Sequence, residues 1–171
     1  AERANGIVQV GARALLLQAG LPAPFWPYAV EYYCLSYNLQ SRGGEPSNWS
    51  KRFGEVFLAP MLPLGSSIRY VPPPNSMVSR PKMESPTDTG IFMGYLRQAG
   101  EHYGEIARVC PLSELEGINM FTGKKPNDQA PVVEQSTQIF SNILGTIPKD
   151  VGDKTPRFPT VSYTHLRAHE T

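Results

Sequence analysis

Metal binding is the first chemistry that the residue types of this chain suggest. His165 and His169 are four residues apart, so on a helix they would share one face and could ligate one metal ion. No third ligand accompanies them, and the pair is therefore rejected as a site. Cys34 and Cys110 lie far apart without CxxC spacing. Each cysteine is predicted to be a buried apolar residue rather than half of a metal site or of a disulfide.

Nucleotide-binding and nucleophile motifs do not occur in the sequence. Neither GxGxxG nor GxxxxGK followed by Ser or Thr is present, and no serine or cysteine stands in a recognisable nucleophile context. The formal net charge of +1 provides no global basic field for nucleic acid, although it leaves a local basic patch open.

The second half of the chain interleaves basic and aromatic residues, a mixture that suits contact with DNA or RNA by a small β-barrel. These residues are Arg69, Tyr70, Arg80, Lys82, Tyr95 and Arg97. An ordinary small-barrel surface carries the same residue types, and that explanation is the favoured one. Lys124-Lys125 is too short a basic run to predict binding.

A helical hairpin is predicted for the first part of the chain. Over residues 1–19 apolar residues recur at three- and four-residue spacings, which predicts one buried helical face. That face consists of Ala4, Val8, Ala12, Leu15, Leu16 and Ala19. Gly20 is typical of a helix C-cap, and a second helix should begin near Phe25 and end at Gly43-Gly44. Without a further layer to cover its apolar stripes, this hairpin is expected to be unstable.

A small β module is predicted for residues 66–141, after an irregular connecting segment at residues 45–65. In that segment Trp49, Phe53, Val56, Phe57 and Leu58 should anchor onto the helices. The candidate strands are residues 67–71, 90–96, 105–110 and, more weakly, 132–139. Because these are too few for two full sheets, the pattern favours a small open barrel. The fold class is therefore α+β, with a disordered tail over residues 142–171.

A spaced series in the helical part resembles copia-type retrotransposon integrases. It matches without a gap the segment that begins at the last carboxylate of their Asp-Asp-Glu triad. The series is Glu2-Arg3-x-Asn5, Ala12-Arg13-x-Leu15-Leu16, Ala19-Gly20-Leu21-Pro22, Phe25-Trp26 and Ala29-Val30. Further along, a second group is similar to the FG…GIFLGY pattern of the β module that follows the integrase core. This group is Phe53-Gly54, Gly65, Val71 and Gly90-Ile91-Phe92-Met93-Gly94-Tyr95.

The resemblance implies a fold and a catalytic residue. Residues 1–44 would be the C-terminal helices of an RNase H-like integrase core, and residues 66–141 an SH3-like β module. In the family, three carboxylates hold two Mg²⁺ or Mn²⁺ ions that activate the attacking group. Glu2 corresponds to the third carboxylate, as a catalytic residue and metal ligand. The alternative is that Glu2 is an ordinary acid in a first helical turn. The two aspartates are absent here, so this chain alone should not catalyse strand transfer.

DNA contacts are the second implication of the resemblance. If Glu2 faces the active site, Arg3, Asn5 and Gln9 lie on the same side of the first helix and could touch DNA phosphates or bases. A solvated polar face explains these three residues equally well. Gly6 departs from the family, where many relatives carry a basic or polar helix former, and this puts one DNA contact in doubt.

The parent protein implied by the resemblance acts on DNA inside the cell, in the nucleus or cytoplasm, as a homo-oligomer. No secretion signal precedes Ala1-Glu2-Arg3, no initiator Met is present, and no apolar run reaches the ~20 residues that span a membrane. We therefore expect part of a longer reading frame.

Residues 161–171, VSYTHLRAHET, resemble translated sequencing adapter. Two alternatives stay open: a non-enzymatic module that binds nucleic acid or protein, and the product of a decayed element.

Overall fold

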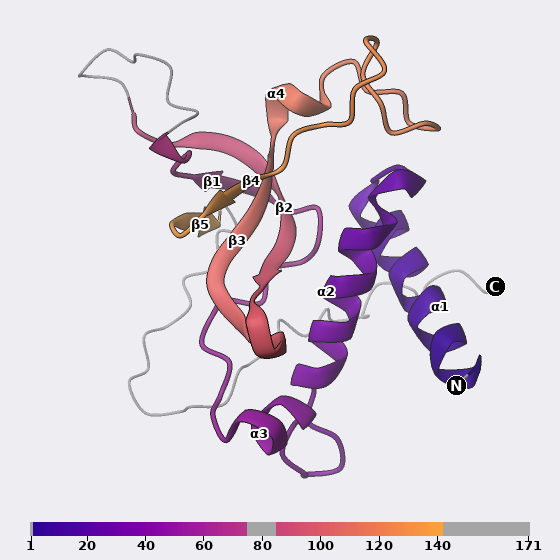
Figure 1. Ribbon diagram of the computed structural model, residues 1–171, viewed down its shortest axis with the longest axis vertical. Helices are drawn as coiled ribbons and strands as arrows, with labels where there is room; N and C mark the ends of the chain where they lie inside the picture. The colour runs from indigo at the N-terminus through magenta and orange to yellow at the C-terminus, as the bar shows by residue number, and fades with distance from the viewer. Residues whose placement is uncertain (1, 75–84, 142–171) are drawn as a thin grey trace, which may run out of the picture.

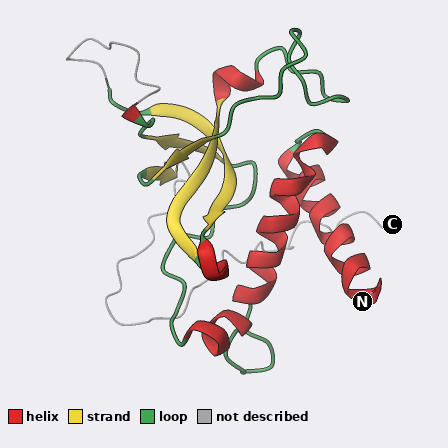
Figure 2. Ribbon diagram, in the orientation of Figure 1, coloured by secondary structure: helices red, strands yellow, loops and turns green. Residues whose placement is uncertain are grey.

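The computed structural model describes residues 2–74 and 85–141, and Figure 1 draws the remaining residues in grey. Helices α1 (Glu2–Ala19) and α2 (Trp26–Leu39) form a hairpin beside a curled antiparallel sheet (Figures 1 and 2). Helix α2 contacts both α1 and the sheet. The prediction of an α+β fold is confirmed. The predicted tail at residues 142–171 lies outside the described residues.

The turn between α1 and α2 follows the signals in the sequence. Gly20 adopts a positive φ of 64°, which favours glycine, and the Leu21 amide donates to the Leu16 carbonyl, 3.1 Å away. A short 3₁₀ turn, η1 (Ala23–Phe25), leads directly into α2. The predicted hairpin is therefore confirmed, but the predicted end of its second helix at Gly43-Gly44 is wrong, because α2 ends at Leu39.

Helix α1 buries its predicted face only in part. Ala12 is buried and the other members of the face from Val8 to Ala19 are half-buried, whereas Ala4 is exposed. The reason is visible in Figure 1, where α1 and α2 meet at their connecting turn and diverge towards the N-terminus. The first turn of α1 consequently lies away from α2 and is not covered by it.

A short helix, α3 (Asn48–Phe53), interrupts the segment that was predicted to be irregular. Ser47 caps it, since the Ser50 amide donates to the Ser47 hydroxyl over 3.2 Å. Trp49 is buried and its ring lies 4.3 Å from that of Phe53. The prediction that Val56 and Leu58 anchor this segment is wrong, because these residues are 43% and 84% exposed.

Within the described residues, the sheet contains five antiparallel strands in the order β4-β3-β2-β1-β5. Three predicted strands are confirmed within a few residues, and the weak fourth one, residues 132–139, is divided between two short strands. The strands are β1 (Ser67–Tyr70), β2 (Asp88–Arg97), β3 (Tyr103–Pro111), β4 (Glu134–Ser136) and β5 (Ile139–Ser141). Two short helical turns flank β3: η3 (Ala99–Glu101) and α4 (Leu112–Leu115).

The segment 134–141 connects the two sides of the curl. Its first half, β4, pairs with β3, and its second half, β5, pairs with β1 at the far side of the sheet. At the bend between them, the Ser136 hydroxyl lies 2.9 Å from the carbonyl oxygens of both Val71 and Gln138. The Val71 amide also donates to the Gln138 carbonyl over 3.1 Å. The sheet is therefore curled into a half-barrel.

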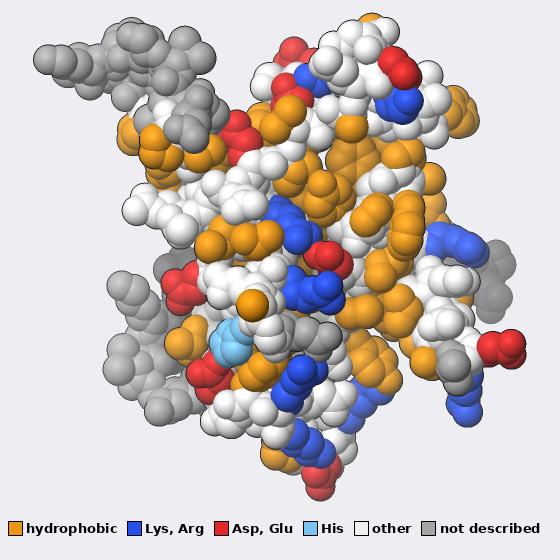
Figure 3. Space-filling view, in the orientation of Figure 1, with side chains coloured by type: hydrophobic (Ala, Val, Ile, Leu, Met, Phe, Trp, Pro, Cys, Tyr) orange, Lys and Arg blue, Asp and Glu red, His pale blue; other side chains and the backbone are white. Residues whose placement is uncertain are grey.

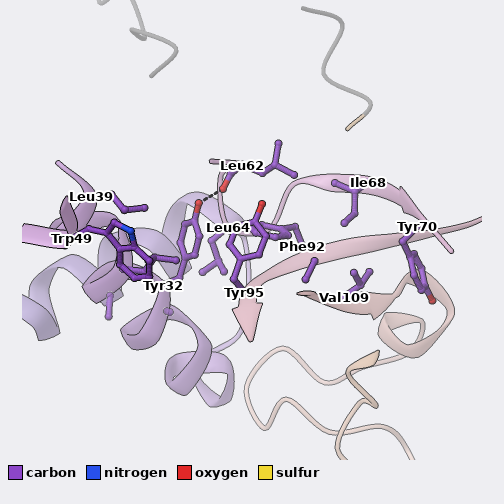
Figure 4. Close-up of a cluster of buried hydrophobic side chains, with 14 residues drawn as sticks. Tyr32, Leu39, Trp49, Leu62, Leu64, Ile68, Tyr70, Phe92, Tyr95 and Val109 are labelled. Atoms are coloured by element: carbon purple, nitrogen blue, oxygen red, sulfur yellow. Dashed lines mark hydrogen bonds between the residues drawn. The ribbon is translucent and has the colours of Figure 1, made fainter. Parts of the chain in front are cut away.

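One hydrophobic cluster runs through the helices and the sheet (Figure 4). Tyr32 of α2 packs edge-on against Phe92 of β2, with ring centroids 5.6 Å apart. The Tyr32 hydroxyl donates to the Leu62 carbonyl, and the Tyr95 hydroxyl donates to the Pro60 carbonyl. The segment before β1 is thereby fixed between α2 and the sheet. The division into residues 1–44, 45–65 and 66–141 stays a prediction.

Two motif glycines lie where a side chain has no room. At Gly65, whose φ is +82°, a Cβ atom would lie 2.9 Å from the Cα of Ala19. At Gly90, a Cβ atom would lie 2.5 Å from a methyl group of Val109 and 2.8 Å from the Cys110 carbonyl oxygen. These glycines allow α1 and the strands to approach closely.

None of the helices in the described part of the chain combines the length and the hydropathy that crossing a lipid bilayer requires.

Candidate functional site

The residues predicted to act on DNA lie at the N-terminal end of α1. Glu2 is in the first helical turn, and the side chains of Glu2, Arg3, Asn5 and Gln9 are all exposed. With 100° between successive residues, Glu2, Asn5 and Gln9 project within about 60° of one another, while Arg3 projects about 100° away from Glu2 and about 160° away from Asn5. The helix thus brings three of the four residues onto one face.

This face does not by itself make a metal centre. Glu2 supplies one carboxylate, whereas a two-metal site needs several oxygen ligands around each ion. Among residues 2–74 and 85–141, no group of three or more His, Cys, Asp or Glu side chains could hold a metal ion. The described residues therefore do not fit a Mg²⁺ or Mn²⁺ pair, and we assign no catalytic step to them.

The tyrosines of the basic and aromatic series in the β module belong to the core. Tyr70 is 1% and Tyr95 is 3% exposed. The Tyr70 hydroxyl donates to a carboxylate oxygen of Glu134 over 2.8 Å. Burial is the main cause that raises the pKa of both hydroxyls above the usual value. Neither ring is available for stacking on a base.

The arginines of the same series are exposed but do not form a basic patch. Arg69 and Arg97 lie at opposite ends of the β1–β2 region, and Arg80 and Lys82 lie outside the described residues. On the face shown in Figure 3, Lys and Arg side chains alternate with Asp and Glu side chains instead of forming one continuous basic area. The explanation as an ordinary polar surface therefore stays the favoured one.

A shallow groove of about 370 Å³ lies between α2 and the sheet. Arg108 of β3 donates to the Glu31 carboxylate of α2, and its guanidinium lies 5.7 Å from the centre of the Tyr28 ring. Both charged side chains are partly buried, at 18% exposed for Arg108 and 35% for Glu31. Since each charge already has an opposite partner, the pair links two elements rather than offering a charge to a ligand. Arg108 and Glu31 are 77 residues apart in the sequence, and no sequence pattern predicts their contact.

The two cysteines are free thiols in different surroundings. Cys110 is fully buried, and burial raises the pKa of its thiol to about 12. Cys34 is half-buried, and burial followed by the charge of Glu31 raises its thiol pKa as well. Because the thiolate is the reactive form, neither cysteine is poised as a nucleophile at neutral pH.

An aromatic cluster around Trp49 joins α3 to the start of β3. The His102 ring lies edge-on to the rings of Trp49 and Phe53, and its Nε2 atom is 2.9 Å from Glu55. The buried Nε1 of Trp49 has no hydrogen-bond partner among the described residues. No pattern in the sequence marks His102, which lies in a turn without periodicity. The ring contacts of His102 indicate that it is a packing residue.

A second ion pair supports the region after α4. Lys125 lies 2.7 Å from Glu114, and the Val132 amide donates to the same carboxylate over 2.8 Å. The hydrogen bond from Lys125, followed by the one from Val132, lowers the pKa of Glu114 below its usual value. The charged Glu114 carboxylate therefore connects α4 to Lys125 and Val132 within the protein.

Comparisons with protein-family models, with curated proteins and with solved structures found no match to this chain. The integrase interpretation consequently rests on the residue series alone.

Proposed function

We propose that this chain is part of a copia-type retrotransposon integrase, and that it contains the last helices of the RNase H-like core and the SH3-like β module. One observation carries the proposal. Packing explains Gly20, Phe25 and Ala29 of the motif series, because they form the turn or are buried. It does not explain Glu2, Arg3 and Asn5, which are exposed. Exposed residues that match a catalytic motif support a role in function.

In the intact parent, Glu2 would complete a set of three carboxylates for Mg²⁺ or Mn²⁺, and the parent would insert element DNA into host DNA. Arg3, Asn5 and Gln9 would contact that DNA from the same end of α1. The parent would work as a homo-oligomer inside the cell. This chain lacks the other two carboxylates of the triad, so we propose that it is inactive on its own.

The reading frame around the chain gives the first test. Sequencing of the source locus should reveal two aspartates upstream of Glu2, the second a few dozen residues before it, and a reverse transcriptase downstream of the β module. A frame that is closed upstream, or that lacks the aspartates, would overturn the catalytic role of Glu2 and leave the decayed element or a binding module.

Strand transfer by the parent protein gives the second test. Glu2→Gln removes one anionic metal ligand without changing the size of the side chain, so joining of a labelled element end to target DNA should fall at least about 100-fold. Glu116→Gln, at an exposed position after α4, is the matched control and should retain activity. Equal activity of the two variants would contradict the proposal.

A further inference from the structure

Arg69 of β1 holds two hydroxyl groups of the segment that leads into β2. Its Nη2 atom donates to the Ser85 hydroxyl over 3.0 Å and to the Thr87 hydroxyl over 2.7 Å. The two hydroxyl oxygens are 2.9 Å apart. Pairing of Arg69 with Thr89 in the β1–β2 ladder fixes this geometry. A guanidinium group thus lies directly beside an exposed serine.

Ser85 also stands in a sequence that protein kinases recognise. Proline-directed kinases act on a serine or threonine hydroxyl that is followed directly by proline in an exposed, non-helical segment. Ser85 is exposed, lies outside helices and strands, and precedes Pro86. It is the only serine of the chain followed by proline, and Thr155 is the only such threonine. Thr87 precedes Asp88 and does not meet this requirement.

We propose that Ser85 is a phosphorylation site for a proline-directed protein kinase and that Arg69 receives the phosphate. This proposal is independent of the integrase assignment. The Ser85 Oγ atom attacks the γ-phosphorus of ATP and forms the new O–P bond. The bond from that phosphorus to the bridging oxygen breaks, ADP leaves with its electron pair, and the hydroxyl proton passes to the base of the kinase.

Arg69 makes the product favourable in the folded chain. The phosphate brings about −1.5 to −2 charges and strong acceptor oxygens to a position where a guanidinium is already within hydrogen-bond distance. Hydrogen bonds in which only the arginine donor is charged are joined or replaced by shorter ones in which both the donor and the phosphate acceptor are charged. The segment 85–87 would then be held more firmly to β1. Asp88, the acidic neighbour in sequence, opposes the new charge but is present in every variant compared below.

Phosphate incorporation tests the first half of the proposal. The full chain is incubated with ATP and a cyclin-dependent or mitogen-activated kinase, and the site is mapped by mass spectrometry of peptides. Phosphate should be found on Ser85 in the unchanged protein and in Thr155→Ala, and it should be lost from this site in Ser85→Ala. Absence of phosphate from Ser85 of the folded chain would overturn the proposal.

A ³¹P NMR titration of the phosphorylated chain tests the second half. With Arg69 beside it, the second phosphate pKa should lie about half a unit lower than in Arg69→Gln, because the guanidinium favours the dianion. Arg97→Gln, at the opposite end of β2, is the matched control and should leave the titration unchanged. Equal titration of the unchanged chain and Arg69→Gln would overturn the role of Arg69.

Discussion

Glu31 and Arg108 join α2 to β3 across 77 residues of sequence. Because both side chains are partly buried, their attraction is screened less than that of an exposed pair. We expect a double-mutant cycle with Glu31→Gln and Arg108→Gln to give a coupling of about 1 kcal/mol or more in urea unfolding. Lys51 and Glu45, 3.1 Å apart but 51% and 71% exposed, are the control pair. Their coupling should stay below about 0.5 kcal/mol, and equal couplings would contradict this explanation.

Cys34 and Cys110 should differ in reactivity. Cys110 is fully buried with a thiol pKa of about 12, whereas Cys34 is half-buried. Alkylation by iodoacetamide at pH 8 should therefore label Cys34 first, and Cys110 only when the protein unfolds. Mass spectrometry of the labelled peptides over time measures both rates. Similar rates for the two thiols in the native protein would mean that the sheet opens easily around Cys110.

At the level of the elements, α1 carries two glycines that should respond differently to substitution by alanine. A Cβ atom at Gly6 meets nothing within 4 Å, so Gly6→Ala should raise the free energy of unfolding by about 0.5–1 kcal/mol through helix propensity. At Gly11 the added atom would lie 2.1 Å from the Tyr33 ring. Gly11→Ala must displace that ring, and it should gain less than Gly6→Ala or lose stability. Urea unfolding of both variants measures the difference, and an equal gain would contradict the close packing.

The elements with local signals could be predicted from the sequence. Apolar spacing and Gly20 located the helical hairpin, and runs of strand-forming residues located β1, β2 and β3. Helix α3 was not predicted because six residues are too few to show periodicity. The bend at Ser136 was missed because no glycine or proline marks it. In the irregular segment no period indicates which side chains face inward, so Leu58 was assigned to the core incorrectly.

The candidate site could be located only as far as its helix. The resemblance placed Glu2 on the first predicted helix, and Glu2 is part of α1. Contacts between elements could not be predicted from the sequence. The Arg108–Glu31 pair and the hydrogen bond from Arg69 to Ser85 depend on how the sheet curls and how α2 lies beside it. The burial of Tyr70 and Tyr95 likewise depends on the register of the strands.

At the level of the whole molecule, the hydrophobic cluster shared by the helices and the sheet implies that neither part is stable alone. A fragment of residues 1–60 would expose the α2 face that packs on Phe92, and a fragment of residues 66–141 would expose the matching face of the sheet. We expect neither fragment to show a cooperative thermal transition by circular dichroism, in contrast to the full chain. A cooperative transition in either fragment would contradict a shared core.

Stability should fall in alkaline solution. The pKa values of Tyr32, Tyr70 and Tyr95 are raised, chiefly by burial. Because the folded state holds these protons more tightly, the groups stabilise it fully below their unfolded pKa near 10. This contribution to the free energy of unfolding is lost as the pH rises towards the folded pKa. Each group lowers the free energy of unfolding by up to about 1.4 kcal/mol per pH unit in that range. Urea unfolding between pH 7 and 11 should therefore be constant at first and then decline, with a smaller decline in Tyr70→Phe. Constant stability up to pH 11 would contradict this.

The segment 134–141 also governs the order in which the protein can form during synthesis. Strands β1 and β3 emerge from the ribosome before residues 134–141, the segment that pairs with the outer edge of each. Until then a nascent chain has two unpaired strand edges, which can pair with those of neighbouring chains. A premature stop shortly before Glu134 would therefore release an aggregation-prone product, although it removes only the last two short strands from the sheet.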